Sequence, residues 1–184
     1  MIVLASQSPR RSEILRQAGI PFAVKPANVD ETARPGESPE DYVKRVARDK
    51  AMAAGAAPGE TVLGADTVVV VDSAILGKPA NSADAVRMLG LLAGREHRVL
   101  TGICLQRDAE MVIDCASTRV WFRPLTPEEI TGYIASGEPM DKAGAYAIQG
   151  LGSKFIERIE GSYTNVVGLP IELVQQILRK META

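Results

Sequence analysis

Apolar and polar residues follow two different periods along the chain, which predicts a mixture of strands and helices. Four consecutive valines at 68–71 have the composition of a strand that is buried on both faces. Three helix starts are marked by serine or threonine before proline, because the hydroxyl caps the first turn and proline suits the first helical position. Strands are expected at 2–5, 22–24, 61–72, 99–105, 111–122 and 155–156, and helices at 9–18, from 39 through 53, at 82–92, at 126–136 and from 170 through 178.

Strands and helices alternate, and a hairpin is expected at 107–108, so the expected fold class is α/β with a mixed sheet. The helix at 82–92 is expected to bury Val86, Leu89 and Leu92 on one face. The 184 residues suit one compact domain, in one or two lobes. A chain of this length buries roughly 70% of its unfolded surface and needs no metal or disulfide to hold it.

Composition narrows the classes of function. Lysine and arginine total 21 against 23 aspartate and glutamate, a net charge of −2, which argues against a surface dedicated to nucleic acid. No run of about 18 apolar residues occurs, so no membrane-spanning helix is expected. His97 is the one histidine, and we expect it to be solvated at the start of a strand. Cys104 and Cys115 have no paired spacing and are expected to be free, buried, reduced thiols of a cytoplasmic protein.

The expected first turn combines two serines, a helix start and two arginines. A helix N-terminus presents unpaired N–H groups and about half a positive charge, which suit a phosphate group. Ser6, Ser8, Arg10 and Arg11 would complete such a site, because arginine binds phosphate oxygens through two parallel hydrogen bonds. The alternative is that Ser8 only caps the helix and that both arginines are solvated.

Asp66 interrupts the apolar strand expected at 61–72. A buried carboxylate is costly without a partner, so it would need a cation, a metal or a raised pKa, each of which is typical of a functional site. The alternative is an exposed strand end. Further charged groups would suit a polyphosphate and a hard divalent ion. They are Lys50, Lys78 between Gly77 and Pro79, Asp30 with Glu31, and Asp141 with Lys142 before a glycine-rich loop. Ordinary turns and solvated surface charges explain each of them equally well.

Six motifs occur in the order and spacing of the Maf proteins, so the chain resembles that family over essentially its whole length. They are SQSPRR at 6–11, VDET at 29–32, GADTV at 64–68, GKP at 77–79, DKAGAY at 141–146 and GLP at 168–170. The resemblance implies a single domain over 1–184, with an elongated mixed sheet flanked by helices as in the inosine triphosphatases and a central cleft between two lobes. It also implies hydrolysis of a nucleoside triphosphate between its α- and β-phosphates, assisted by a divalent metal such as Mg²⁺ or Mn²⁺.

The resemblance also assigns roles to the matching positions. Asp66 would accept the proton, and Asp66 and Glu31 would face the metal. Three positions, Arg10, Thr67 and Gln149, match the branch that resembles dTTP/UTP pyrophosphatase, whereas the 7-methyl-GTP branch has tryptophan, glutamine and glutamate there. The Gln149 amide offers a donor and an acceptor, which suits the N3–H and carbonyl edge of uracil or thymine. The implied phosphate-binding residues are Ser6, Ser8, Arg11, Lys50 and Lys78.

These inferences predict a cytoplasmic enzyme that acts on dTTP and UTP, and modified pyrimidine nucleotides would fit the same recognition. The expected partners are the nucleotide and, because symmetric assemblies are common, a second copy of the chain. Neither nucleic acid nor a membrane is an expected partner. The competing hypothesis is a non-catalytic, nucleotide-binding regulator of cell division, since the family is named for an association with inhibition of septum formation.

Overall fold

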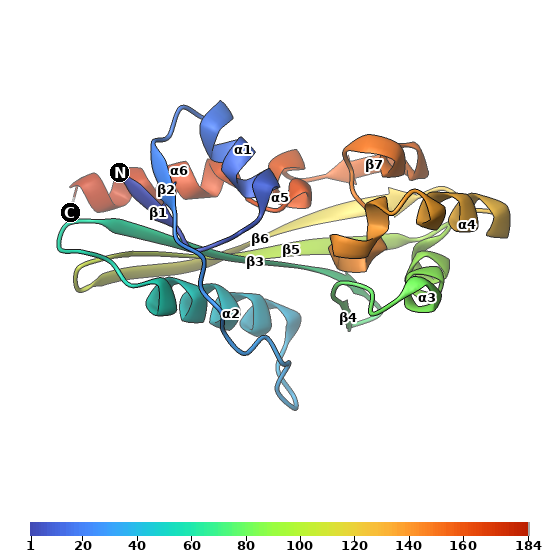
Figure 1. Cartoon of the computed structure of the whole chain (residues 1–184), viewed down its shortest axis with the longest axis horizontal. Helices are drawn as coiled ribbons and strands as arrows, with labels where there is room; N and C mark the ends of the chain where they lie inside the picture. Colours follow the sequence, from blue (N-terminus) through green and yellow to red (C-terminus); the bar gives the residue numbers. More distant parts are fainter. Residues whose placement is uncertain (184) are drawn as a thin grey trace. The chain divides into compact units, whose positions relative to one another are not determined.

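The computed structural model describes residues 1–183, and Ala184, the last residue of the predicted domain, lies outside the described residues. Helices and strands alternate along most of the chain, and the expected hairpin joins the two longest strands (Figure 1). In chain order the elements are β1 (Ile2–Leu4), α1 (Pro9–Gln17), β2 (Phe22–Val24), α2 (Pro39–Ala54), β3 (Thr61–Val71), β4 (Ala74–Leu76), α3 (Ser82–Leu92), β5 (Glu96–Arg107), β6 (Glu110–Phe122), α4 (Pro127–Ala135), the 3₁₀ helices η1 (Glu138–Asp141), η2 (Ala143–Ala145) and η3 (Gly150–Phe155), β7 (Ile156–Glu160), α5 (Tyr163–Val167) and α6 (Ile171–Thr183).

The strands within residues 1–183 form one seven-stranded mixed sheet, which confirms the predicted α/β class. Its order is β2-β1-β3-β5-β6-β7, and β4 pairs with β3. β1 runs parallel to both β2 and β3, whereas β4 is antiparallel to β3 and β7 is antiparallel to β6.

The chain divides into two compact units, in agreement with the two lobes that the family resemblance implies. The first unit comprises Met1–Thr67, Thr101–Ala116 and the chain from Gly168 on, and the second comprises Val68–Leu100 and Ser117–Val167. The long strands β3, β5 and β6 contribute residues to both units.

In the first unit, α2 packs directly against the sheet because two glycines leave room for it. A Cβ on Gly64 of β3 would lie 2.0 Å from the carbonyl oxygen of Ala47, and one on Gly102 of β5 would lie 2.3 Å from that of Val43. Figure 1 shows α2 on one side of the sheet and α1 and α6 on the other. The glycines therefore fix where α2, and the side chains that it carries, meet β3.

In the second unit, α3 buries Leu89 and Leu92 as predicted, but the predicted burial of Val86 is wrong. Val86 is 47% exposed, and Ala85 and Met88 are buried in its place. The buried positions are spaced by three, four and seven residues, which is one continuous face of a helix, and Val86 lies one position off it.

The predicted solvated position of His97 is also wrong. The ring of His97 is 2% exposed, its Nε2 lies 2.8 Å from the Tyr146 hydroxyl, and it packs edge-on against Phe122 and Tyr146. Burial lowers the pKa of His97 from 6.5 to about 4. Its aromatic neighbours come from segments far away in the chain, so the polar residues around His97 in the sequence gave no sign of this core.

Three predicted helix starts are confirmed, because Ser8, Ser38 and Thr126 each accept a hydrogen bond from the backbone N–H three residues further on. Cys104 and Cys115 are both free thiols, as expected, but only Cys104 is buried and Cys115 is partly exposed. Within residues 1–183, no helix combines the length and the apolar character that crossing a bilayer requires.

Candidate functional site

Lys50 of α2 and Asp66 of β3 form a buried ion pair in the first unit. Asp66 lies two residues after Gly64, so its side chain leaves β3 on the face against which α2 packs. Lys50 Nζ donates to Asp66 Oδ1 at 2.8 Å, and Asp66 is 7% exposed. The structure thus places Asp66 inside the protein with a cation partner, which is one of the three alternatives that the sequence reasoning gave for a buried carboxylate.

The surroundings of Asp66 make it an unusual carboxylate. Burial raises the pKa of the Asp66 carboxyl above its ordinary value, and the positive charges of Lys50 and, to a smaller extent, Arg11 oppose that rise. A carboxylate with a raised pKa is a better proton acceptor than a solvated one, and the bond from Lys50 fixes its orientation.

The loop before α2 brings Glu31 to the same ammonium group. Lys50 Nζ also lies 2.8 Å from Glu31 Oε1, so one lysine bridges the two carboxylates predicted to face a metal. Among residues 1–183, no group of three or more His, Cys, Asp or Glu side chains is arranged to hold a metal ion. Mg²⁺ is often bound by only one or two carboxylates when phosphate and water oxygens complete its shell. Asp66 and Glu31 therefore fit a divalent ion that binds together with a phosphorylated ligand.

Ser6, Ser8 and Arg11 come together at the start of α1. Ser6 Oγ accepts hydrogen bonds from the Ser8 N–H at 3.2 Å and from Arg11 Nη1 at 3.0 Å, and its own O–H remains able to donate. Ser8 Oγ accepts from the Arg11 backbone N–H at 3.5 Å. Ser8 is thus the cap of the helix, and Ser6 presents a buried hydroxyl beside it.

Arg11 is buried, which excludes the solvated position that was the alternative. Its Nε donates to the Gly168 carbonyl at 2.8 Å, and its Nη1 and Nη2 donate to Ser6 and Thr67 at 3.0 and 3.1 Å. Arginine has five N–H donors. One N–H on each terminal nitrogen is therefore left for an anion, within the part of the chain that the structure describes. Arg10 precedes it in α1 and is partly exposed.

Thr67 follows Asp66 on β3, so the two side chains leave the strand on opposite faces. Thr67 Oγ1 lies 2.9 Å from Thr101 Oγ1 and 3.3 Å from the Gly168 carbonyl, in addition to accepting from Arg11. The structure therefore brings this branch-specific residue to Arg11 and not to the Asp66 carboxylate, and its role in specificity stays a prediction.

Lys78 and Gln149 belong to the second unit, where both are exposed. Their loops are linked, because the Gly77 carbonyl accepts from the Gly144 N–H at 3.0 Å. Gly144 has φ +68° and its Cβ would lie 2.7 Å from Val69 Cγ2, so a side chain at this position would be strained. The expected ion pair between the neighbouring residues 141 and 142 is present.

Four residues around the site were missed in the sequence. Gly102 is an isolated glycine in an apolar strand, which is a signal of close backbone approach, and Thr101 is the polar residue beside it. Arg45 pairs with Glu37 near the Glu31 loop. Nothing in the local sequence indicates that pair, because charged residues on a helix are usually solvated.

The family model for Maf-like protein matches residues 1–181 of this chain. Two curated proteins named dTTP/UTP pyrophosphatase are similar over nearly the whole length. The one from Koribacter versatilis is 51% identical over 180 residues, which cover 97% of this chain and 93% of the relative. The one from Geobacter metallireducens is 54% identical over 183 residues, which cover 98% of this chain and 95% of the relative.

Among solved structures, the Staphylococcus aureus Ham1 protein matches with a TM-score of 0.60 and 16% sequence identity, over 98% of each chain. At that identity the likeness concerns the fold alone. It confirms the prediction of an inosine triphosphatase-like fold.

Proposed function

This chain belongs to the Maf family, and from that premise we propose that it hydrolyses nucleoside triphosphates, dTTP and UTP foremost, to the monophosphate and pyrophosphate. The two relatives described above, which are 51% and 54% identical to this chain, are named dTTP/UTP pyrophosphatase. The observation that carries the proposal is the Asp66 carboxylate, buried in an otherwise apolar strand and held by Lys50. Burying two charges in a strand costs free energy that an apolar pair would not, which favours a functional reason for this pair.

In the proposed reaction, water attacks the α-phosphorus and Asp66 accepts its proton. Burial raises the pKa of Asp66, so the carboxylate takes up a proton more readily than an exposed aspartate does. The hydrogen bond from Lys50 keeps one carboxylate oxygen engaged and leaves the other to face the water. Residues of the first unit therefore supply both the base and the group that orients it.

Phosphate binding falls to the start of α1 and to the lysines. Ser6 offers its O–H, Arg11 offers two N–H groups, and Lys50 offers the third donor of its ammonium. These donors would neutralise the charge that develops on the leaving pyrophosphate. Ser8 and Lys78 complete the proposed set; the exposed Lys78 ammonium makes no ion pair with any residue in 1–183.

A divalent metal, Mg²⁺ or Mn²⁺, is part of the proposal. Asp66 and Glu31 would hold it together with phosphate oxygens, because both carboxylates already converge on one positive charge. When bound, the metal lowers the pKa of a coordinated water and offsets phosphate charge. Lys50 keeps the two carboxylates together by balancing their negative charges.

Arg10, Thr67 and Gln149 are the proposed specificity residues. The exposed Gln149 amide makes no capping hydrogen bond at the start of η3, so it is available to the N3–H and carbonyl edge of a pyrimidine. Modified pyrimidine nucleotides present the same edge. A cytoplasmic location, a homodimer and the action of 1–184 as one functional domain stay predictions.

The proposal is tested with Asp66→Asn in a pyrophosphate-release assay with added inorganic pyrophosphatase and Mg²⁺ or Mn²⁺. Turnover of dTTP should fall by about 10²-fold or more, because general-base catalysis contributes about that factor. Asp114→Asn, an exposed aspartate of β6, is the matched control and should leave turnover unchanged. Near-normal turnover by Asp66→Asn would show that Asp66 is not the general base. Wild-type protein that turns over no nucleotide in a panel of triphosphates would favour the non-catalytic regulator instead.

A further inference from the structure

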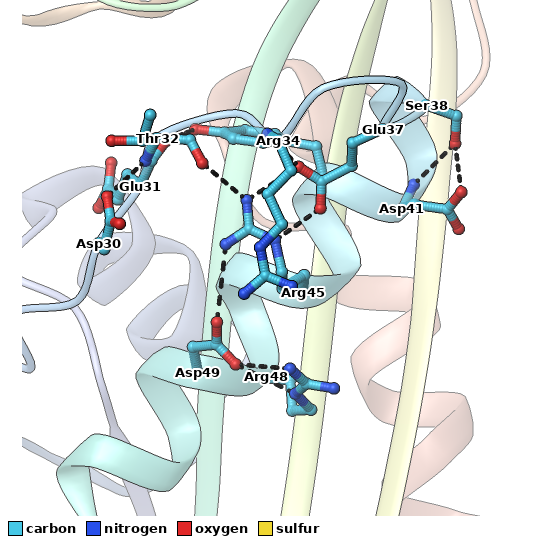
Figure 2. A network of polar contacts seen from close by, with 11 residues as sticks. Asp30, Glu31, Thr32, Arg34, Glu37, Ser38, Asp41, Arg45, Arg48 and Asp49 are labelled. Carbon is cyan, nitrogen blue, oxygen red and sulfur yellow. Dashed lines mark hydrogen bonds and ion pairs between the residues drawn. The ribbon is translucent and has the colours of Figure 1, made fainter.

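A buried cluster at the start of α2, formed with Glu37 of the segment before the helix, has no part in the proposed chemistry but holds the loop that carries Glu31 (Figure 2). Arg45 and Glu37 are its centre. Arg45 Nε donates to Glu37 Oε1 at 2.6 Å and Nη2 donates to Oε2 at 2.9 Å, and the two side chains are only 8% and 9% exposed. This is the two-point geometry in which arginine binds a carboxylate most strongly.

The cluster, which we call the Tyr42–Arg45–Glu37 clamp, contacts the backbone of the Glu31 loop at three points. Arg45 Nη2 donates to the Thr32 carbonyl at 3.0 Å, and the Tyr42 hydroxyl donates to the Glu31 carbonyl at 2.8 Å. Glu37 Oε2 accepts from the Arg34 N–H at 3.0 Å. These bonds fix the loop at its metal-facing residue and at two of the three residues that follow it.

The Glu31 side chain itself is not held by packing. It is 52% exposed, and its carboxylate reaches Lys50 from a loop without regular secondary structure. Ordering such a segment costs about 1–2 kcal/mol per residue in backbone entropy, so the contact needs support from the surrounding backbone. Tyr42 and Arg45 of the clamp supply that support from α2, the same helix that carries Lys50.

We propose that Tyr42, Arg45 and Glu37 are positioning residues, which hold the Glu31 carboxylate on Lys50 and so maintain the charge arrangement around Asp66. The inference rests on the proposed function. Arginine is required at position 45 because its planar guanidinium donates to the Glu37 carboxylate and to the Thr32 carbonyl at the same time. A lysine ammonium is a single point charge and cannot reproduce that geometry.

Arg48 provides a matched control on the same helix. It lies three residues beyond Arg45, and its side chain is 42% exposed. Its guanidinium donates to the Asp49 carboxylate (Figure 2). No bond joins Arg48 to the Glu31 loop within residues 1–183. Arg48→Lys therefore makes the same chemical change without removing a bond to the loop, and among the described residues it reaches Arg45 only through Asp49, whose Oδ2 lies 3.7 Å from Arg45 Nη1.

The decisive experiment is a double-mutant cycle between Arg45→Lys and Glu31→Gln, with dTTP turnover as the readout. Arg45→Lys should lower kcat about tenfold, since a displacement of about 1 Å in a catalytic group costs up to 10²-fold and the loop is loosened rather than removed. In the Glu31→Gln background the same change should cost less than about twofold, because its target is gone. Arg48→Lys should change kcat in neither background.

A second readout uses neither metal nor nucleotide. Amide hydrogen exchange in residues 28–36 should be faster in Arg45→Lys and in Tyr42→Phe than in the wild type, and unchanged in Arg48→Lys. Tyr42→Phe removes one hydroxyl only, so it replaces Arg45→Lys in the cycle if the lysine variant does not fold.

Three results would overturn the inference: equal losses from Arg45→Lys with and without Glu31, a normal kcat in Arg45→Lys, or unchanged exchange in the loop. Wild-type protein that hydrolyses no nucleotide would instead refute the proposed function, and the exchange comparison would still decide whether the clamp holds the loop.

Discussion

Gly64→Ala is the change that tests most directly how the fold builds the site. The added methyl group would lie 2.0 Å from the Ala47 carbonyl oxygen and 2.8 Å from the Ala51 nitrogen, both of them backbone atoms of α2. Side-chain rotation cannot relieve such a contact. The helix must therefore move away from β3.

The size of that movement follows from the geometry. Cβ atoms essentially never approach another heavy atom within 3.0 Å, so a contact at 2.0 Å requires a shift of about 1 Å. Lys50 lies between Ala47 and Ala51 on α2, and its hydrogen bond to Asp66 is 2.8 Å long. A displacement of about 1 Å would stretch that bond beyond hydrogen-bonding distance. We expect kcat to fall by up to about 10²-fold, and overpacking to destabilise the fold by about 1–3 kcal/mol.

The assay measures dTTP turnover and the thermal unfolding midpoint in parallel. The midpoint should fall by about 2–4 °C for each kcal/mol lost. Gly90→Ala is the control: Gly90 lies inside α3 with no atom within 4 Å of its Cβ position, and alanine should stabilise that helix slightly. A Gly64→Ala protein with wild-type turnover and midpoint would show that close packing of α2 does not position Lys50.

Three further variants address charge, recognition and pH. Lys50→Met removes a group that lowers the pKa of Asp66, so the acid limb of the kcat/KM profile should move to higher pH; an unmoved limb would contradict the pairing. Gln149→Glu should reduce turnover of dTTP and UTP selectively, with exposed Gln176→Glu as control, and an equal loss for all nucleotides would reject base reading. His97 has a pKa lowered to about 4 from 6.5, so its contribution to stability is complete above pH 6.5 and is lost as the pH falls toward 4. Urea unfolding at pH 7.5 and 5 should show about 2 kcal/mol of this loss in the wild type and none of it in His97→Gln.

The sequence by itself determined most of the longer helices and strands and the chemistry that they could carry, but not β4, α5, the 3₁₀ helices or the length of β7. Ser8, Ser38 and Thr126 cap helices within three residues of themselves, so these helix starts could be predicted from local patterns. The need of a buried Asp66 for a cation, a metal or a raised pKa followed likewise from one charged residue in an apolar run. The ordered motifs identified the family, which the full-length relatives confirm.

Only the tertiary structure decided which groups meet. Lys50 is the partner of Asp66 because Gly64 admits α2 to the strand, and Thr67 faces Arg11 because neighbours on a strand point to opposite faces. His97 is buried because aromatic residues from distant segments enclose it. Periodicity reports which face of an element is apolar, but contacts between remote segments depend on how those faces are brought together, and no local pattern of residues encodes that.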